Sequence, residues 1–282
     1  MRHVLQLIFF AVSNGYWLGF FQNKIYQGNG KKFCLPGLNC YSCPGALGAC
    51  PIGALQASLT GATKTFPFYA LGFLICFGAL LGRGVCAFLC PFGLVQDLLH
   101  KLKPKGWQKN FALPKIFRKL PYVIFVVFVI LMPLFLTNQF GISSPAFCKY
   151  ICPSGTFFGA IPLLSGNEGL RSMISDLFFW KLFLLIVFLI WSVIEYRPFC
   201  KYFCPLGAFY GLFHTVSWYR MEYEESACTG CRKCSKVCKM GIDVVERPND
   251  RGCIRCGDCV KNCPEQALSL CFEKKSFETS EE

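Results

Sequence analysis

Hydrophobic residues along this chain are gathered in four runs, separated by polar and cysteine-rich segments. The clearest runs cover about residues 121–137 and 178–195, and each predicts a helix of roughly 25 Å, close to the thickness of a bilayer core. Two further runs lie at about residues 62–84 and 4–21. We therefore expect a mainly α fold in which a four-helix transmembrane bundle precedes a more polar C-terminal part.

The first run has a second interpretation. Met1, Arg2 and His3 form a short basic start, and Ala11 to Ser13 is weakly similar to a cleavage site, as in a signal peptide. Because the apolar run resumes after Asn14, we favour a membrane span.

A short basic loop between the second and third runs predicts the orientation. Its basic residues are Lys101, Lys103, Lys105, Lys109, Lys115, Arg118 and Lys119. By the positive-inside rule this loop is cytoplasmic, so we expect a multi-pass protein of the cell membrane with both termini in the cytoplasm. The segments 22–65 and 138–177 then lie on the outer face.

Composition agrees with lipid as the surrounding solvent. The 282 residues are 54% hydrophobic, with a mean hydropathy of +0.42. The net charge of +13 is concentrated in loops, where it indicates topology rather than binding of nucleic acid. The chain contains 20 cysteines, many in metal-ligand spacings that disulfide-rich secreted proteins do not require.

The sequence Cys-Pro-x-Gly occurs four times, beginning at Cys50, Cys90, Cys152 and Cys204. The last three copies have another cysteine four residues earlier, at Cys86, Cys148 and Cys200. Each half of the chain then consists of a helix, an outer cysteine loop, a helix and an inner cysteine pair, which predicts two helix-pair repeats. Cysteines four apart are expected on one face of a helix, and the proline after them stops that helix or begins the next.

Two such pairs supply the four thiolates of one [4Fe-4S] cluster. The inner set, at the cytoplasmic face, is Cys86, Cys90, Cys200 and Cys204. The outer set is Cys148 and Cys152 with Cys43 and Cys50, and Cys40 is the alternate ligand. Disulfides are the rival interpretation of the outer cysteines. Cys34 is left over, and Cys76 and Cys271 are interpreted as small buried hydrophobic residues.

Arg83 and Arg197 precede the inner pairs at equivalent positions. They either place cations beside an anionic cluster or anchor helix ends among lipid headgroups, and both interpretations stay open. His100 and His214 are assigned no role.

The C-terminal part contains the strongest motif. CTGCRKCSKVC begins at Cys228 and CIRCGDCVKNC begins at Cys253, and each is the CxxCxxCxxxC run of two-cluster ferredoxins. The fourth cysteine of each run serves the other cluster, so the predicted sets are Cys228, Cys231, Cys234 and Cys263, and Cys253, Cys256, Cys259 and Cys238. This spacing favours iron over zinc. We expect a membrane domain at residues 1–220 and a cytoplasmic α+β ferredoxin module at residues 221–282.

With four spans, inner CxxxCP pairs and this ferredoxin module, the chain resembles the NapH family of ferredoxin-type membrane quinol dehydrogenases. It is also similar to the membrane part of the NosR family. The resemblance implies redox roles for the inner cysteines and electron transfer between a quinone or flavin pool and a partner. The outer cysteines depart from the NapH pattern.

That departure favours electron transfer across the membrane, from a cytoplasmic donor through the ferredoxin module, an inner cluster and an outer cluster to an extracytoplasmic flavoprotein. A single hop across a roughly 30 Å hydrocarbon core is too slow, so re-entrant outer loops such as Thr156–Ser165 would have to bring the clusters closer. Quinol dehydrogenation and redox sensing or cluster assembly are the alternatives. No nucleotide loop or flavin site is evident, so we expect other subunits of an oxidoreductase complex to supply the terminal chemistry.

Overall fold

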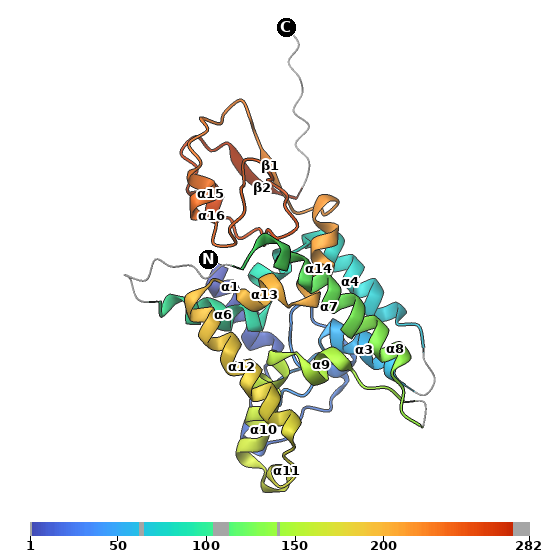
Figure 1. The fold of residues 1–282 in the computed structure, drawn as a ribbon. Coiled ribbons are helices and arrows are strands. Elements are labelled where there is room, and N and C mark those ends of the chain that lie inside the picture. The colour runs from blue at the N-terminus through green and yellow to red at the C-terminus, as the bar shows by residue number, and fades with distance from the viewer. Residues whose placement is uncertain (1, 62–64, 104–112, 140–141, 273–282) are drawn as a thin grey trace.

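The computed structural model describes residues 2–61, 65–103, 113–139 and 142–272 (Figure 1). The start of the second predicted span (62–64), Lys105 and Lys109 of the basic loop, and the end of the ferredoxin module (273–282) lie outside the described residues. The elements in chain order are α1 (Arg2–Ser13), α2 (Leu18–Gln22), η1 (Asn29–Lys32), α3 (Pro51–Thr60), α4 (Phe68–Leu81), α5 (Gly84–Phe88), α6 (Pro91–Lys101), η2 (Lys115–Lys119), α7 (Leu120–Ile124), η3 (Phe125–Leu131), α8 (Met132–Phe135), α9 (Ala146–Tyr150), η4 (Gly155–Ala160), α10 (Ile161–Gly166), α11 (Glu168–Arg171), α12 (Asp176–Ile194), α13 (Pro198–Tyr202), α14 (Pro205–Leu212), η5 (Phe213–Thr215), β1 (Arg220–Tyr223), α15 (Lys233–Val237), α16 (Asp258–Lys261) and β2 (Leu268–Cys271).

Two helical stretches in the described residues are long and apolar enough to cross a bilayer. They are α12 and the continuous stretch Ile116–Phe135, which runs from η2 through α8 and includes a π-helical segment at η3. The other two predicted spans are shorter: α1 has 12 residues and α4 has 14. By length and composition, the structure therefore contains two of the four spans expected from the hydrophobic runs.

Polar residues explain why the first run does not form one long helix. The side-chain amide of Asn14 donates to the carbonyl oxygen of Phe10 and to Ser13 Oγ, which ends α1. The backbone of Ser13 then accepts a hydrogen bond from Leu47, and the thiol of Cys43 donates to Asn14 Oδ1. Helix α1 therefore ends at the point where Ser13 and Asn14 form hydrogen bonds with the loop that contains Cys43 and Leu47.

Four helical stretches expose large apolar side chains, as expected for surfaces that face lipid. The exposed residues are Val4, Leu5, Leu7, Ile8 and Val12 on α1, Phe68, Tyr69, Ile75 and Leu80 on α4, Val123, Val126, Leu131 and Phe135 on the stretch from η2 to α8, and Phe179, Trp180, Phe183, Ile186 and Ile190 on α12. The short helices α1 and α4 thus present the same kind of surface as the two long stretches.

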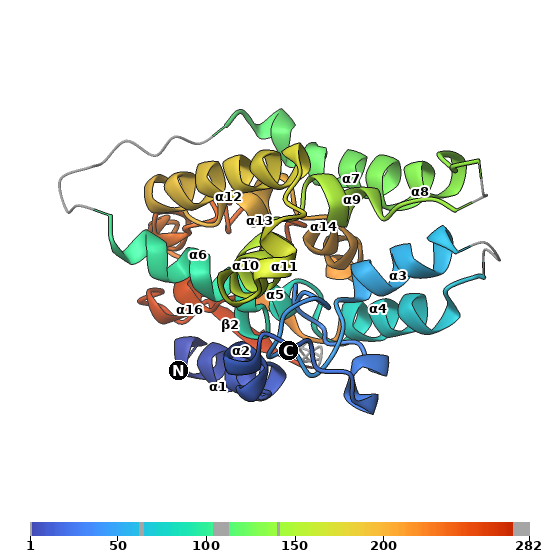
Figure 2. The ribbon, with the colours of Figure 1, turned by 90° about the horizontal axis from the view of Figure 1, so that it is seen from below.

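The helices form two neighbouring groups around a common core (Figure 2). In one group α6 packs against α1 and α12, and in the other α4 packs against α3 and α14. The short cysteine-bearing helices α5 and α13 lie between the groups, and the core contains Phe92, Phe199 and Tyr210. The short cysteine-bearing helices therefore lie together in the middle of the molecule, between the two groups of longer helices.

Each Cys-Pro-x-Gly motif begins a helix, as predicted. Cys90 and Cys204 are the N-cap residues of α6 and α14, and the following proline is the first helical residue, where its missing N–H costs nothing. The prediction that paired cysteines lie on one face of a single helix is wrong. The first cysteine belongs to a short helix, α5 or α13, and the second caps the next helix.

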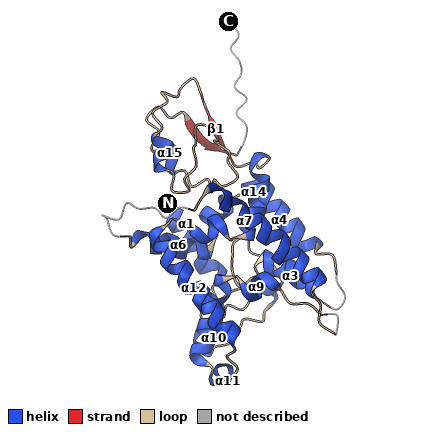
Figure 3. Cartoon of the chain, in the orientation of Figure 1, coloured by secondary structure: helices blue, strands red, loops and turns tan. Residues whose placement is uncertain are grey.

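The C-terminal part contains the sheet of the described structure (Figure 3). Strands β1 and β2 pair antiparallel, with Arg220 opposite Cys271 and Tyr223 opposite Leu268. The guanidinium of Arg255, which is fully buried, donates to the carbonyl oxygen of His214 at 2.6 Å and fastens this part to the end of the membrane domain.

Candidate iron–sulfur sites

The first predicted set of ferredoxin ligands lines one small cavity. Cys228, Cys231 and Cys234 come from the first run, and Cys263 comes from the second. The backbone amide of Gly230 points at Cys228 Sγ, 3.4 Å away. Thiols that lie 25 or more positions apart in the sequence are thus brought to one space, with the fourth cysteine exchanged between the runs.

The second predicted set lines a separate cavity. Its cysteines are Cys238, Cys253, Cys256 and Cys259, and its wall also includes Tyr196 from the loop between α12 and α13. Since Tyr196 belongs to the membrane domain, this second set lies at the side of the ferredoxin module that faces that domain.

The four inner cysteines are also brought together. Cys86, Cys90, Cys200 and Cys204 are all buried, and each thiol interacts electrostatically with at least one thiol of the opposite pair. Burial raises the pKa of the Cys200 thiol to about 11, so iron has to displace its proton on binding. Gln96 Nε2 donates a hydrogen bond to the same sulfur at 3.2 Å.

Two buried arginines connect the halves of the inner set. Arg197 Nη1 donates to the carbonyl oxygen of Cys86 at 2.6 Å, and Arg83 Nη2 donates to the carbonyl oxygen of Cys200 at 2.8 Å. Each arginine therefore holds the first cysteine of the other CxxxCP pair. Of the two interpretations left open by the sequence, the structure supports cations beside the cysteines.

The glycine of the Cys-Pro-x-Gly motif makes room for these arginines. A Cβ atom on Gly93 would lie 3.3 Å from Arg197 Nη1, and one on Gly207 would lie 3.0 Å from Arg83 Nη2. The amides of the same two glycines point at the sulfurs of Cys90 and Cys204, each at 3.4 Å. The motif thus supplies a thiol, an amide donor to it and space for a cation.

Asp97 provides the counter-charge for Arg197. The guanidinium donates from Nε to Oδ1 at 2.7 Å and from Nη2 to Oδ2 at 2.5 Å, and both side chains are buried. Burial alone would raise the pKa of Asp97, but the charge and hydrogen bonds of Arg197 outweigh it and hold the pKa below its ordinary value. The inner site therefore includes a fully formed buried ion pair.

The outer thiols that meet are Cys40, Cys50, Cys148 and Cys152. Cys148 interacts electrostatically with the other three, and Cys50 interacts with Cys152 and Cys40. Lys181 on α12 donates to the carbonyl oxygen of Cys148 at 3.2 Å. The outer set thus resembles the inner one: two halves of the chain meet, and a cation holds the first cysteine of a pair.

Cys43, the preferred fourth ligand in the sequence analysis, points elsewhere. Its thiol donates to Asn14 Oδ1 at 3.5 Å. Cys40 Sγ, in contrast, lies beside Gly155 of the Cys152 motif, 3.6 Å from where a Cβ atom on that glycine would be. The geometry therefore favours Cys40, the alternate ligand. Cys34, Cys43, Cys76 and Cys271 are not among the members assigned to the four sets, and no two described cysteines form a disulfide. Cys76 is exposed on α4, so the interpretation of this residue as buried is wrong.

The segment from Cys34 to Cys50 fills the space between the inner and outer sets. Its residues Leu38 and Asn39 are buried, and the carbonyl oxygen of Leu38 accepts a hydrogen bond from Ser154, next to Cys152. On the other side, a Cβ on Gly37 would lie 3.0 Å from the Cα of Cys90. One short loop therefore contacts both sets.

Tyr210 on α14 bridges the same space. Its hydroxyl donates to the carbonyl oxygen of Pro36 at 3.0 Å, and its side chain is fully buried. It interacts electrostatically with Cys86 of the inner set and with Cys50 of the outer set. A single side chain thus lies within reach of both sets.

These sites fit [4Fe-4S] clusters by their chemistry. Each has four thiols with amide donors or cations nearby, which suit an anionic cubane. In all but the first ferredoxin set, the four thiols are buried or half-buried. Among the described residues, no three His, Cys, Asp or Glu side chains converge on one point as a single metal ion requires. A cubane binds its four cysteines through four different iron atoms, so such convergence is not needed.

Sequence reasoning missed several residues of these sites. Asp97, Gln96, Lys181 and Tyr210 all act across long sequence separations, and the residue types alone do not reveal a partner. Asp97 carries the only weak signal, because a carboxylate in a helix next to a membrane requires a counter-ion.

The family model of the 4Fe-4S binding domain matches the chain three times, at residues 63–110, 120–171 and 177–220. Each matched segment contains one CxxxCP pair: Cys86 with Cys90, Cys148 with Cys152, or Cys200 with Cys204. The ferredoxin module follows the last matched segment.

Relatives extend the comparison. An uncharacterized protein of Methanocaldococcus jannaschii is 33% identical over 203 residues, which cover 70% of this chain and 76% of the relative. The putative electron transport protein YccM of Escherichia coli is 24% identical over 296 aligned positions, covering 97% of this chain and 75% of YccM. The ferredoxin-type protein NapH of Haemophilus influenzae is 27% identical over 210 residues, covering 70% of this chain and 65% of NapH. The predicted resemblance to the NapH and NosR families is confirmed. No solved structure matches the chain.

Proposed function

Since the chain belongs to the family of the 4Fe-4S binding domain, we propose that it is a membrane electron-transfer subunit of an oxidoreductase complex. It passes electrons between a cytoplasmic donor and an extracytoplasmic partner such as a flavoprotein. Four [4Fe-4S] clusters supply reversible one-electron chemistry. The ligands are the two ferredoxin sets, the inner set, and an outer set in which Cys40 takes the place of Cys43.

The observation that carries this proposal is the order of the four cysteine sets. Cys234 of the first ferredoxin set and Cys259 of the second belong to one small core, and the second set shares its cavity with Tyr196. The next residue, Arg197, holds Cys86 of the inner set. Tyr210 then lies between the inner and outer sets. The protein holds the sets as a series that leads from the module into the membrane domain.

One feature of the chain supports a shorter distance between the inner and outer sets in a transmembrane series. The loop from Cys34 to Cys50 enters the domain, and the short helix α1 ends where this loop is held. Non-helical backbone is tolerated at such depth because protein covers it. The outer cysteines are therefore drawn toward the inner ones instead of lying a full bilayer thickness away.

Four membrane spans with both termini in the cytoplasm are part of the proposal. Helices α1 and α4 share the lipid-facing apolar surface of the two longer stretches. Arg118 of the basic loop donates to the carbonyl oxygens of Met240 and Gly241, and Arg2 lies 3.7 Å from Asp258. Arg2, Arg118 and the ferredoxin module thus lie on the same side, which is the cytoplasmic side by the positive-inside rule.

Iron content tests the proposal. Anaerobically purified protein is expected to contain about sixteen irons per chain, and a Cys148→Ser/Cys152→Ser variant about twelve, with one EPR component lost. A Cys76→Ser variant is the control and keeps all of them, because Cys76 belongs to no set. About eight or twelve irons in the wild type, unchanged by the double substitution, would exclude the outer cluster and favour quinol dehydrogenation at the inner site.

A further inference from the structure

We propose that a cationic cavity between the membrane domain and the ferredoxin module binds a phosphate-bearing anion. The cavity has a volume of about 380 Å³, within the range of small-molecule sites. Its basic lining residues are Arg83, Arg118, Lys119, Lys201, Arg247 and Arg251. None of them is a proposed cluster ligand, so this site is additional to the electron-transfer function.

The cavity has a surplus of positive charge. Its six cations face three carboxylates, Asp243, Glu246 and Asp250. Two of these carboxylates are engaged in their own loop: Asp243 accepts from Ser235 Oγ at 2.9 Å, and Asp250 accepts from the amide of Gly252 at 2.7 Å. Even with all three carboxylates ionised, the cations of the lining outnumber them.

Two arginines of the cavity, Arg83 and Arg118, are hydrogen-bonded to backbone carbonyl oxygens. Arg83 donates to the carbonyl oxygens of Cys200 and Arg251, and Arg118 donates to those of Met240 and Gly241. Within the described part of the chain, no carboxylate lies within 4.0 Å of any arginine of this cavity.

Buried charge adds to this surplus. Arg83 is buried, and its Nε atom has no hydrogen-bond partner among the described residues. Lys201 is the one lining cation that has a described counter-ion, Glu195 at 2.9 Å. A buried donor without a hydrogen-bond partner is unfavourable, and an anion that accepts from Arg83 Nε would remove that cost.

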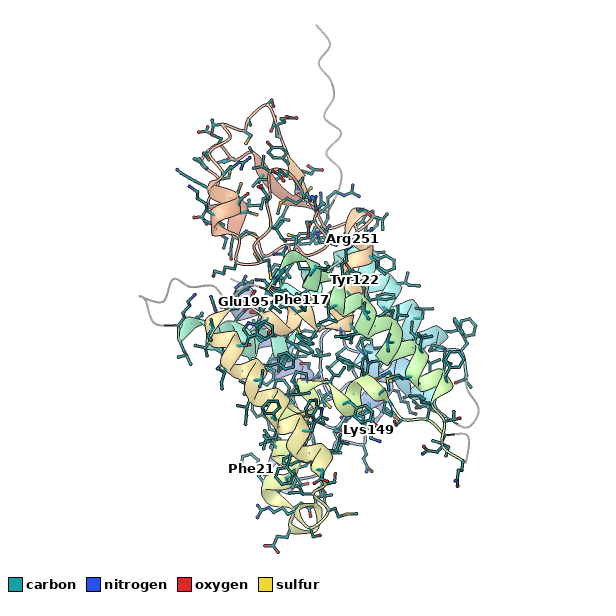
Figure 4. All side chains as sticks on the ribbon, viewed as in Figure 1. Phe21, Phe117, Tyr122, Lys149, Glu195 and Arg251 are labelled. Atoms are coloured by element: carbon teal, nitrogen blue, oxygen red, sulfur yellow. The ribbon has the colours of Figure 1, made fainter. Side chains whose placement is uncertain are left out.

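Phosphate is the anion that suits this arrangement. The planar forks of several arginines match the oxygens of a phosphate group better than those of a single carboxylate. The cavity also includes Pro121 and Tyr122, at the start of the stretch Ile116–Phe135, the expected level of lipid headgroups. Figure 4 shows Arg251 of the module above Tyr122 at this junction. The phosphate belongs either to an anionic phospholipid or to a soluble phosphate compound.

The anion would connect two parts of the protein. Arg247 and Arg251 belong to the ferredoxin module, whereas Arg83, Arg118 and Lys201 belong to the membrane domain. Phosphate bound between them neutralises repulsion across the junction and holds the module in place. Hydrogen exchange in residues 240–252 is therefore expected to slow when the anion binds.

The test uses the full-length protein in a neutral detergent. Two probes are titrated separately by calorimetry: inorganic pyrophosphate and a short-chain phosphatidylglycerol. The test variant is Arg247→Gln/Arg251→Gln, since both side chains are exposed at the rim and touch no cysteine set. The control variant, Lys24→Gln/Lys32→Gln, removes the same charge from exposed positions in the segment after α2.

The wild type is expected to bind at least one probe, and the test variant to bind it about tenfold more weakly, as loss of charge-assisted hydrogen bonds requires. Binding of pyrophosphate identifies a soluble phosphate compound, and binding of phosphatidylglycerol alone identifies a lipid headgroup. The control should match the wild type. No binding of either probe, equal affinities of wild type and test variant, or an equal loss in the control would overturn the proposal.

Discussion

The guanidinium of Arg197 donates a hydrogen bond to the carbonyl oxygen of Cys86, which lies 111 positions earlier in the chain. Arg83 makes the corresponding contact with Cys200. The two inner CxxxCP segments are thus interlocked, because each arginine orders the cysteine loop of the other segment. Loss of either arginine is expected to loosen both halves of the inner site.

Asp97 tests how much the inner site depends on its ion pair. The change Asp97→Asn removes the carboxylate that pairs with the buried Arg197, and removal of one partner of a buried ion pair costs about 3–5 kcal/mol. The midpoint temperature of thermal unfolding and the iron content per chain should both be lower than in the wild type. The change Asp176→Asn, at an exposed position at the start of α12, is the control. A loss of less than about 1 kcal/mol in D97N would show that the pair is not needed.

Cys40 and Cys43 form a matched pair of substitutions in one loop. The structure places Cys40 with Cys50, Cys148 and Cys152, and Cys43 with Asn14. Cys40→Ser is therefore expected to remove about four irons per chain, and Cys43→Ser none. The reverse pattern in iron analysis and EPR spectra would restore the assignment made from sequence.

The motif glycines differ in what surrounds them. Gly207→Ala places a methyl group 3.0 Å from Arg83 Nη2, so we expect about 1–3 kcal/mol of destabilisation and weaker inner-cluster EPR signals. Gly53→Ala changes the same motif position in the first copy, where the nearest atom is 3.8 Å away. This control should be close to wild type, and equal effects of the two changes would contradict the crowding argument.

His214 predicts a dependence of stability on pH. Burial, together with Arg255 and Arg83, lowers the pKa of His214 to about 2, whereas an unfolded histidine titrates near 6.5. Because only the unfolded chain takes up the proton, stability falls as pH drops below 6.5, by about 2 kcal/mol at pH 5.

Unfolding measured between pH 7 and pH 5 checks this prediction. His214→Gln should flatten the dependence, and His3→Gln, at a partly exposed position, should leave most of it. An unchanged slope in H214Q would assign the acid sensitivity to other groups.

The ferredoxin sets are grouped by the structure as the sequence predicts, since ligand spacing within a short run restricts where its thiols can lie. The inner set follows from the repeat, because Cys86 and Cys200 occupy equivalent positions. The choice between Cys40 and Cys43 has no such constraint. It depends on how Asn14 and Lys31 hold the loop, and these contacts come from distant or adjoining segments that spacing alone does not reveal.

Helix length is the other point at which the sequence was insufficient. Hydropathy counts Ser13 and Asn14 as two weak positions in a long run, but both are buried and end α1. The ion pair between Arg197 and Asp97 could not be predicted from the sequence either, because the two residues lie 100 positions apart. Polar residues in apolar runs matter through their partners, and the partners are set by the tertiary structure.

The N-cap cysteines imply two different routes of cluster assembly. In the membrane domain, Cys90 and Cys204 accept hydrogen bonds from the glycine amides as part of helix geometry, so these sulfurs are oriented by the polypeptide itself. The ferredoxin module has a small core of its own around Met221, Val244 and Leu268 and depends more on bound metal for its shape. Iron would thus bind to cysteines of the membrane domain that are already in position, whereas in the module iron binding would drive folding. Partial depletion of iron during growth would leave the membrane domain folded and the module as the part that proteases reach first.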